Sequence, residues 1–392
     1  MSSSSRNRAI ILIVFPIVLV LLAFLVGSIA YSKYTRGIYI ILAALLVADL
    51  AVALRGRWRD LATIIATLVF GFAAIELGSA AFQRDIAGET KGFSVSRPVL
   101  GWGPSAPGVY HGERRAEDGT FVYSADYTID DHLLRKTESA ASGPTVAFFG
   151  DSMTFGQGLA DADTLPQAFA DLIQRKMHVL NFGFPGYGPQ QFLRALETGL
   201  FDPLLTNAKV FVYETAAWHV ERAACTAGFV ARAPRYDLRD GKPVFVGACA
   251  AGLKRILTDV FVSSAAFRRF VSPVASTPSA ADVELYIAEL TRSSELVRAK
   301  YGAPLVILYL SESDAYLAKS GYTDAKIKQR LQEAGVDVVD ASLSPADFPP
   351  GTLLAIPGDG HPTAAANRAR AALLQKHLAA QTSILAVSPA QN

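Results

Sequence analysis

The stretch Phe148-Phe-Gly-Asp-Ser152 ends a short apolar segment that begins at Thr145, and Met153-Thr-Phe-Gly156 follows it. Five apolar or β-branched residues in a row are typical of a strand that is buried on both faces. A glycine directly after a strand permits a tight turn, and the pattern beyond it begins a helix. We therefore expect the hydroxyl of Ser152 at the carboxyl end of a strand, beside the free N–H groups of a helix N-terminus.

Strand and helix patterns alternate on the C-terminal side of this turn. We expect short apolar strands at residues 145–149, 178–182, 209–213, 304–310 and 336–340, and amphipathic helices at residues 164–176, 190–200, 281–300, 324–334 and 363–380. Such alternation gives a parallel sheet that is covered by helices on both faces. The predicted fold is therefore a doubly wound α/β domain, in which chemistry belongs at the carboxyl ends of the strands.

A second short segment supplies the groups that a reactive serine needs. Pro357-Gly-Asp-Gly-His-Pro-Thr363 lies directly before the last predicted helix and places Asp359 and His361 in one loop. A serine nucleophile needs a base that takes its proton, and the base needs an acceptor that fixes its tautomer. Ser152, His361 and Asp359 can fill these three roles.

Gly-Asp-Ser after the first strand, combined with Asp-x-His before the final helix, resembles the SGNH, or GDSL, hydrolase family of serine esterases and acyltransferases. The resemblance covers residues 145–381 and implies a flavodoxin-like parallel sheet. It also implies that Ser152 is the nucleophile and that Asp359 and His361 supply the acid and base. The other histidines show no metal-ligand spacing, so we expect no metal and no cofactor.

The family resemblance also bears on the oxyanion hole, the N–H groups that stabilise the tetrahedral intermediate. The second block of the family matches Asn181-Phe-Gly-Phe-Pro-Gly-Tyr-Gly188. This match implies that the N–H of Gly186, with Gly183 as the fallback, joins the N–H of Ser152 in the hole.

The third block departs from the family pattern. Family members carry Gly-x-Asn-Asp there, and the first Asn donates a side-chain hydrogen bond to the oxyanion, but this chain reads Tyr213-Glu-Thr-Ala-Ala-Trp-His219. Loss of one oxyanion donor can lower the rate by about 10²–10³-fold. His219 or Trp218 could replace the missing donor; the alternative is that both are buried core side chains.

The first 83 residues differ in composition from the rest. Apolar stretches at residues 9–32, 37–54 and 61–83 are each long enough to cross or nearly cross a hydrocarbon core of about 30 Å. We expect three transmembrane helices, or two if the first stretch is a signal peptide cleaved near Ala30. Asp49 and Glu76 are the charges inside these stretches, and each lies near enough to a helix end to reach an interface or a helix partner.

Basic residues predict the topology, because short cytoplasmic loops carry an excess of Lys and Arg. Arg55, Arg57 and Arg59 fill the second loop, whereas the first loop holds Lys33 and Arg36. We therefore expect a multi-pass protein of the inner (cytoplasmic) membrane with a cytoplasmic N-terminus. The C-terminal domain is expected in the periplasm or outside the cell, whether or not the first stretch is cleaved.

The expected organisation is a membrane anchor at residues 1–83, a lead-in with short strands at 84–144, and a hydrolase-like domain at 145–392. An insertion at about residues 220–275 holds both cysteines, Cys225 and Cys249, around a hairpin predicted from strands at 229–232 and 242–246 with an Asp-Gly turn. On the oxidising side of a membrane such cysteines favour a disulfide over two unpaired buried thiols.

Together these features predict a membrane-anchored serine esterase, and the family resemblance implies acyl groups, often acetyl, of envelope or surface glycans as substrate. Two alternatives remain: an O-acyltransferase that uses the same acyl-enzyme, and a non-catalytic subunit of a membrane complex. Expected partners are an acyl ester of a glycan or lipid, membrane lipid, and a membrane protein that supplies acyl donors or exports polysaccharide. The balance of 37 basic against 35 acidic residues argues against nucleic-acid binding.

Overall fold

The structure of the chain is a computed structural model. It describes residues 14–19, 21–22, 34–82, 92–116, 119–262, 264–271, 277–311 and 315–381. The chain divides into two compact units, residues 1–85 with 259–274 and residues 86–258 with 275–392. Ser152, Asp359 and His361 all belong to the second unit, so the candidate site is built within one unit.

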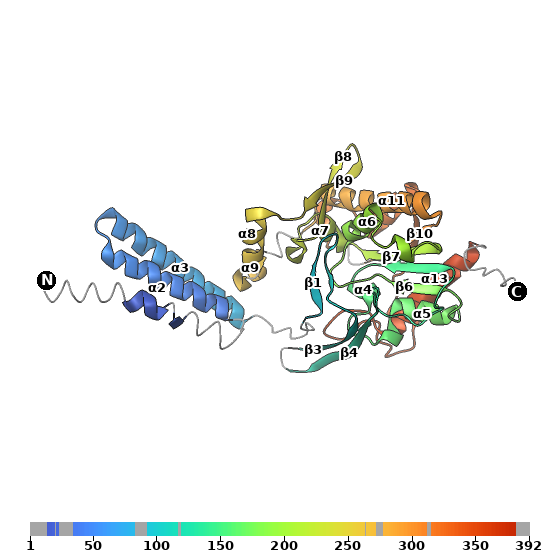
Figure 1. The fold of residues 1–392 in the computed structure, drawn as a ribbon, viewed down its shortest axis with the longest axis horizontal. Helices are drawn as coiled ribbons and strands as arrows, with labels where there is room; N and C mark the ends of the chain where they lie inside the picture. The colour runs from blue at the N-terminus through green and yellow to red at the C-terminus, as the bar shows by residue number, and fades with distance from the viewer. Residues whose placement is uncertain are drawn as a thin grey trace. The chain divides into compact units, whose positions relative to one another are not determined.

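The first unit contains two long apolar helices, α2 (Thr35–Ala53) and α3 (Arg57–Ala81), which pack against each other (Figure 1). Both are long and apolar enough to cross a membrane, and each has a mean hydropathy of 2.0. They correspond to the second and third predicted spans, whereas the first, residues 9–32, lies mostly outside the described residues. The described part of the chain therefore supports two candidate spans and not the predicted three.

Glu76, near the end of α3, has a structural partner within the first unit. Its carboxylate accepts hydrogen bonds from Ser264 Oγ at 2.6 Å and from the amides of Ala265 and Ala266 at 2.9 and 3.1 Å. These amides begin the short helix α9 (Ala265–Phe270), whose first N–H groups have no partner within the helix. Glu76 therefore caps a helix.

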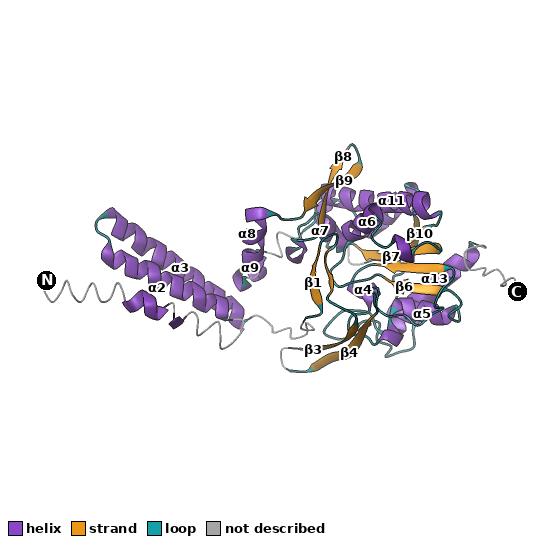
Figure 2. Ribbon diagram, viewed as in Figure 1, coloured by secondary structure: helices purple, strands orange, loops and turns teal. Residues whose placement is uncertain are grey.

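The second unit is built on a five-stranded parallel sheet (Figure 2). Its strands are β5 (Thr145–Phe149), β6 (His178–Asn181), β7 (Ala208–Ala216), β10 (Leu305–Leu310) and β11 (Asp337–Asp340). They lie in the order β11-β10-β7-β5-β6, and every neighbouring pair is parallel. All five predicted strands are present, which confirms the doubly wound α/β architecture.

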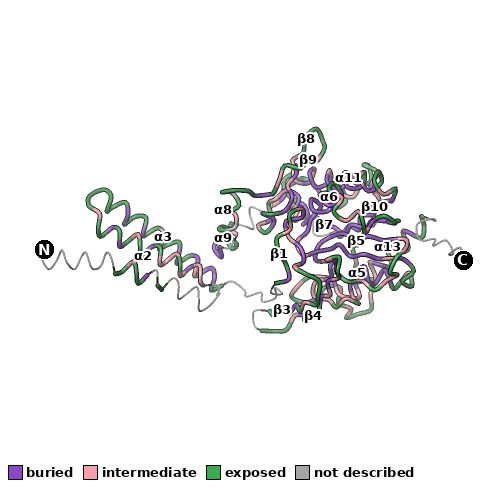
Figure 3. The backbone as a smooth tube through the Cα atoms, in the orientation of Figure 1, coloured by how far each residue is buried: buried purple, intermediate pink, exposed green. Residues whose placement is uncertain are grey.

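Helices cover both faces of this sheet because successive strand residues point to opposite sides. Val146 and Phe148 of β5 pack in one hydrophobic cluster, and Ala147 and Phe149 pack in the other. The first cluster includes α5 (Leu165–Leu172) and α13 (Ala364–Ala380), and the second includes α6 (Pro189–Thr198), α11 (Ala280–Tyr301) and α12 (Asp324–Glu333). The sheet is thus a buried middle layer (Figure 3).

The strand order places a ligand crevice beside β5. The chain passes from β5 to β6 on one side and then returns to β7 on the other, so the direction of winding reverses between β5 and β7. In open α/β sheets, ligands bind outside the carboxyl ends of the strands at such a switch point. Helix α4 (Ser152–Phe155) begins at this position, so the fold brings Ser152 to the expected crevice.

The described residues include three antiparallel hairpins beside the sheet: β1 (Ser94–Arg97) with β2 (Gly101–Pro104), β3 (Gly108–Arg115) with β4 (Phe121–Ile129), and β8 (Pro234–Arg239) with β9 (Lys242–Ala248). The last is the predicted insertion hairpin, but its first strand was predicted wrongly at 229–232. A two-residue turn at 240–241 pairs Arg239 with Lys242, and strand pairing counted from this turn reaches back only to Pro234.

The insertion is fastened at its base. Cys225 and Cys249 form the predicted disulfide, with 5.4 Å between their Cα atoms. Cys225 follows the short helix α7 (His219–Ala223), and helix α8 (Gly252–Val262) begins shortly after Cys249. The disulfide therefore ties the end of α7 to the end of the hairpin.

Candidate active site

The turn between β5 and α4 requires glycine at position 150. Gly150 has a φ of +154°, and a Cβ there would lie 2.2 Å from Thr154 Oγ1 and 3.1 Å from the carbonyl oxygen of Glu214. Asp151 then caps α4, because its Oδ1 accepts the amide of Met153 at 2.8 Å. Ser152 is left as the first helical residue, directly beside the cap.

The structure brings Ser152, His361 and Asp359 together, although the serine and histidine are 209 positions apart. His361 Nε2 lies 2.8 Å from Ser152 Oγ, and His361 Nδ1 is hydrogen-bonded to Asp359 Oδ2. The side chain of Asp359 is fully buried. With its Nδ1 proton donated to Asp359, the imidazole can accept the serine proton at Nε2.

Arg114 of β3 is a member of this group that sequence analysis missed. Its Nη1 is paired with Asp359 Oδ1, on the oxygen that His361 leaves free. Burial alone would raise the pKa of Asp359, but the hydrogen bond and charge of His361 and the charge of Arg114 lower it below its usual value. Asp359 is therefore held as a carboxylate. We refer to Ser152, His361, Asp359 and Arg114 as the Ser152 cluster.

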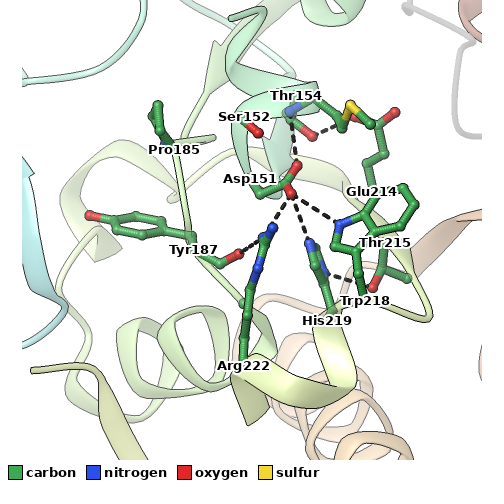
Figure 4. Close-up of polar contacts among 12 residues, drawn as sticks. Asp151, Ser152, Thr154, Pro185, Tyr187, Glu214, Thr215, Trp218, His219 and Arg222 are labelled. Atoms are coloured by element: carbon green, nitrogen blue, oxygen red, sulfur yellow. Dashed lines mark hydrogen bonds and ion pairs between the residues drawn. The ribbon is translucent and has the colours of Figure 1, made fainter. Parts of the chain in front are cut away.

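Asp151 belongs to a second group of side chains. Its Oδ2 accepts hydrogen bonds from Trp218 Nε1 at 3.3 Å, His219 Nε2 at 3.1 Å and Arg222 Nη1 at 2.7 Å (Figure 4). Trp218 and His219, the predicted substitute oxyanion donors, thus both donate to Asp151, and His219 is fully buried. The surroundings of His219 match the alternative of a core histidine, whereas Trp218 is only partly buried. Asp151, Trp218, His219 and Arg222 form the Asp151 cluster.

Opposing effects set the charges in the Asp151 cluster. Burial raises the pKa of Asp151, but the charge of Arg222 and the hydrogen bonds from His219 and Met153 hold it well below its usual range. Burial, followed by the charge of Arg222, lowers the pKa of His219. The cluster therefore contains an ionised Asp151, a charged Arg222 and a neutral histidine near pH 7.

The predicted backbone donors differ in availability. Among the described residues, the amide N–H groups of Ser152 and Gly186 donate a hydrogen bond to no acceptor. The amide of Gly183, the predicted fallback, donates to Asn181 Oδ1 at 3.0 Å. Gly186 has a φ of +81°, and a Cβ there would lie 3.1 Å from the Phe229 ring and 3.2 Å from the Trp102 ring. The geometry therefore favours Gly186 over Gly183 as the second donor.

A cavity of about 630 Å³ opens onto Ser152 and His361. Its walls are mainly aromatic, with a few polar side chains among them. It is lined by Gly92, Phe93, Ser94, Trp102, Tyr127, Ser152, Phe155, Gln157, Phe184, Pro185, Gly186, Arg222, Phe229 and His361. Within the described residues, no group of His, Cys, Asp and Glu is arranged to hold a metal ion.

Comparison with known proteins adds structural likenesses at low identity. No model of a protein family matches the sequence, and no curated protein matches it. Similar solved structures include a lipolytic G-D-S-L family member from Veillonella parvula DSM 2008, at 12% identity, covering 59% of this chain and 96% of that one with a TM-score of 0.34.

Two further solved structures carry enzyme names. A carbohydrate acetylesterase family member from Sinorhizobium meliloti is 15% identical, covers 62% of this chain and 99% of its own, and has a TM-score of 0.34. An acetylxylan esterase from Geobacillus stearothermophilus is 14% identical, covers 60% of this chain and 94% of its own, and has a TM-score of 0.34. In the present chain, the candidate site is defined by the geometry of the Ser152 cluster.

Proposed function

We propose that the protein is a serine esterase that works through an acyl-enzyme on Ser152. The observation that carries this proposal is the contact of 2.8 Å between Ser152 Oγ and His361 Nε2, with Nδ1 of the same imidazole bonded to the buried Asp359. This arrangement supplies a nucleophile, a base and the group that orients the base. It favours an enzyme over a non-catalytic subunit of a membrane complex.

In the proposed first step, Ser152 Oγ attacks the ester carbonyl while His361 Nε2 takes the hydroxyl proton. The negative oxygen of the tetrahedral intermediate is stabilised by the amides of Ser152 and Gly186. The intermediate then expels the alcohol, to which His361 returns the proton, and leaves an acyl group on Ser152. Water attacks this acyl-enzyme with His361 again as base, which releases the acid and restores the serine.

We further propose an acylated glycan, with acetyl as the acyl group, as the substrate. A cavity of about 630 Å³ is far larger than an acetyl group, so the alcohol part of the ester must occupy most of it. The aromatic walls at Trp102, Phe184 and Phe229 offer broad apolar surfaces, while Gln157 and Ser94 offer hydrogen-bonding groups. This mixture suits a sugar ring, which presents both C–H faces and hydroxyl groups.

Transfer of the acyl group to a glycan hydroxyl is a second candidate function, favoured by the missing Asn of the third block. An oxyanion hole with two backbone donors is expected to support slow attack by water. A bound sugar hydroxyl that is held in attack geometry gains rate from proximity and could still react well. Hydrolase and transferase would share Ser152, His361 and Asp359 and differ in the acceptor.

We also propose that α2 and α3 anchor the protein in a cytoplasmic membrane, with the second unit on the outer side. Arg55, Arg57 and Arg59 lie in or next to the turn between the two helices, which favours a cytoplasmic turn. Both other ends of the helices, including the end that leads into the second unit, then lie outside. The disulfide between Cys225 and Cys249 fits an oxidising compartment.

The test uses the full chain in detergent or lipid nanodiscs with a fluorophosphonate probe and a short-chain nitrophenyl ester. We expect Ser152→Ala to abolish labelling and to lower hydrolysis at least about 10⁴-fold, and Asp359→Asn to lower it about 10³-fold. Ser344→Ala, at an exposed serine far along the chain, is the matched control. Labelling that persists in Ser152→Ala would refute the assignment of the nucleophile.

The same preparation distinguishes hydrolysis from transfer. Turnover that rises when an oligosaccharide acceptor is added, with acylated sugar as product, would favour the transferase. Unchanged turnover across several acceptors would favour the esterase. Folded protein without Ser152-dependent release or transfer from short-chain, glycan and lipid esters would favour the non-catalytic subunit.

A further inference from the structure

The oxyanion hole lacks the side-chain donor of the third block, so its geometry depends on two backbone amides from different loops. The amide of Ser152 belongs to the turn after β5, and the amide of Gly186 belongs to the loop after β6. A displacement of about 1 Å in such a site can lower a rate about 10²-fold. The relative position of the two loops must therefore be fixed by other contacts.

Arg222 of α7 makes contacts that join these two loops. Its Nη1 donates to Asp151 Oδ2 at 2.7 Å and to the carbonyl oxygen of Tyr187 at 2.6 Å (Figure 4). Asp151 directly precedes Ser152, and Tyr187 directly follows Gly186. One nitrogen atom thus holds the immediate neighbours of both candidate oxyanion donors.

Other contacts hold Arg222 itself in place. Its carbonyl oxygen accepts a hydrogen bond from Gln190 Nε2 at 2.8 Å, and the Cys225–Cys249 disulfide fixes the chain just after α7. Its side chain is 12% exposed, and it lines the cavity that holds Ser152. Its Nε is buried and has no hydrogen-bond partner among the described residues. An unpaired buried N–H lowers the stability of the fold. Arg222 nevertheless keeps this position, in which its Nη1 contacts both loops.

We infer that Arg222 is a positioning residue of the oxyanion hole, which fixes the amides of Ser152 and Gly186 relative to each other. The inference rests on the proposed esterase function and deepens it. The chain lacks the third donor of the family pattern. Arg222 instead aligns the two donors that remain, the amides of Ser152 and Gly186. Arg222 is expected to affect the chemical step and to leave substrate binding largely unchanged.

Two substitutions of Arg222 separate the effect of its charge from the effect of its two hydrogen bonds. Arg222→Lys keeps a cation beside the buried Asp151, but the lysine chain is one bond shorter and cannot make both contacts of Nη1. Arg222→Met removes both the charge and the contacts. Arg330→Met is the matched control, because Arg330 is also ion-paired, with Glu284, but lies on α12 outside the cavity lining.

The measurement is steady-state hydrolysis of a nitrophenyl ester per fluorophosphonate-titrated site, together with the thermal midpoint and the pH profile. We expect kcat to fall about 10²-fold in Arg222→Met and about tenfold in Arg222→Lys, with KM within about threefold of wild type. The pH profile should keep its position, because His361 and Asp359 are untouched. A purely structural role would lower the thermal midpoint and the titrated fraction without changing kcat per site.

The Lys variant decides the inference if Arg222→Met fails to fold, because it retains the charge that Asp151 requires. Folded Arg222→Lys with kcat within about threefold of wild type would overturn the inference while leaving the esterase intact. A loss confined to KM would also overturn it. Wild-type protein without Ser152-dependent turnover would instead overturn the proposed function, and the inference with it.

Discussion

Asp151 and Ser152 are neighbours in the chain, yet their side chains belong to two clusters that each contain one Asp, one His and one Arg. Each cluster also connects its histidine to a hydroxyl group: His361 to Ser152 Oγ at 2.8 Å, and His219 to Thr215 Oγ1 at 2.9 Å. The Ser152 cluster opens onto the cavity, whereas His219 and Thr215 are almost completely buried. An Asp–His–hydroxyl set therefore indicates catalysis only where a substrate can reach the hydroxyl.

The two clusters also differ in which carboxylate oxygen the arginine contacts. Arg114 reaches the oxygen of Asp359 that His361 leaves free, so the guanidinium and the imidazole contact different oxygens of the carboxylate. In the Asp151 cluster, Arg222 donates to the same oxygen that Trp218 and His219 use. The first arrangement leaves the imidazole able to exchange a proton, and the second fixes a neutral imidazole as a hydrogen-bond donor.

The largest expected effect separates the two histidines. His361→Gln should lower ester hydrolysis at least about 10⁴-fold with little change in the thermal midpoint, because it removes the base from a partly exposed site. His219→Gln should lower the free energy of unfolding by about 1–3 kcal/mol, because it disturbs buried hydrogen bonds, while hydrolysis falls less than about tenfold. Equal losses of hydrolysis in both variants would remove the distinction between the clusters.

The second expected effect concerns the disulfide, which fixes the chain just after α7 and so supports the Asp151 cluster. Cys225 and Cys249 are separated by 24 positions, and in the chain-entropy model a loop of this length is worth about 3 kcal/mol. The double variant Cys225→Ser, Cys249→Ser should lose about this much unfolding free energy in denaturant titrations. Two free thiols in protein extracted from membranes would contradict both the bond and the proposed outer location.

Sequence reasoning predicted the part of the candidate site that is local along the chain. Ser152 was predicted from the strand-to-helix turn, and Asp359 and His361 from one loop before the last helix, because each pattern spans only a few residues. The sheet was predicted for the same reason, since its buried strands appear as short apolar runs.

The residues that sequence reasoning missed depend on contacts between distant segments. Arg114 lies 245 positions before Asp359, and Arg222 lies 71 positions after Asp151. Neither arginine stands in a recognisable sequence motif. The residues around each of them look like those around an ordinary ion-paired arginine at the surface. Because the Asn of the third block is missing, Trp218 and His219 were predicted as substitute donors. Their ring N–H groups donate to Asp151 instead.

The third expected effect is a pH-dependent loss of stability through the Asp151 cluster. Burial, with the charge of Arg222, lowers the pKa of His219 in the folded protein. The unfolded chain therefore binds this proton first, below the usual histidine value of about 6.5. Stability should fall as the pH drops below about 6.5, by at most about 1.4 kcal/mol per pH unit, until the folded pKa is reached.

Unfolding free energies at pH 7.5 and 5.5 test this expectation in three proteins. Wild type and His361→Gln should both lose stability over this range, and His219→Gln should lose less. His178, whose pKa is lowered by burial and by His132, contributes to the loss in all three proteins alike. An equal loss in His219→Gln and wild type would show that His219 is not the group that titrates.

The smallest expected effect concerns Arg114, and it sharpens the contrast between the two arginines. In Arg114→Met, Asp359 loses its cationic partner and keeps the hydrogen bond of His361, so its pKa should rise, and its carboxylate should hold His361 less firmly. Asp359 should then take up a proton at a higher pH than in wild type, and a protonated Asp359 cannot hold the Nδ1 proton of His361 as a carboxylate does. Above neutral pH Asp359 remains a carboxylate without Arg114, so we expect kcat/KM to fall only about threefold there.

The diagnostic result is therefore the shape of the pH profile of kcat/KM in Arg114→Met. Its acid limb should move to higher pH, whereas Arg222→Met should lower the whole profile without moving it. Arg115→Met is the matched control, since Arg115 is the next residue of β3 and pairs with Glu113 at the surface. An acid limb that stays in place or moves to lower pH in Arg114→Met would show that the charge of Arg114 does not act on Asp359. The two arginines would then differ only in the carboxylate that they hold.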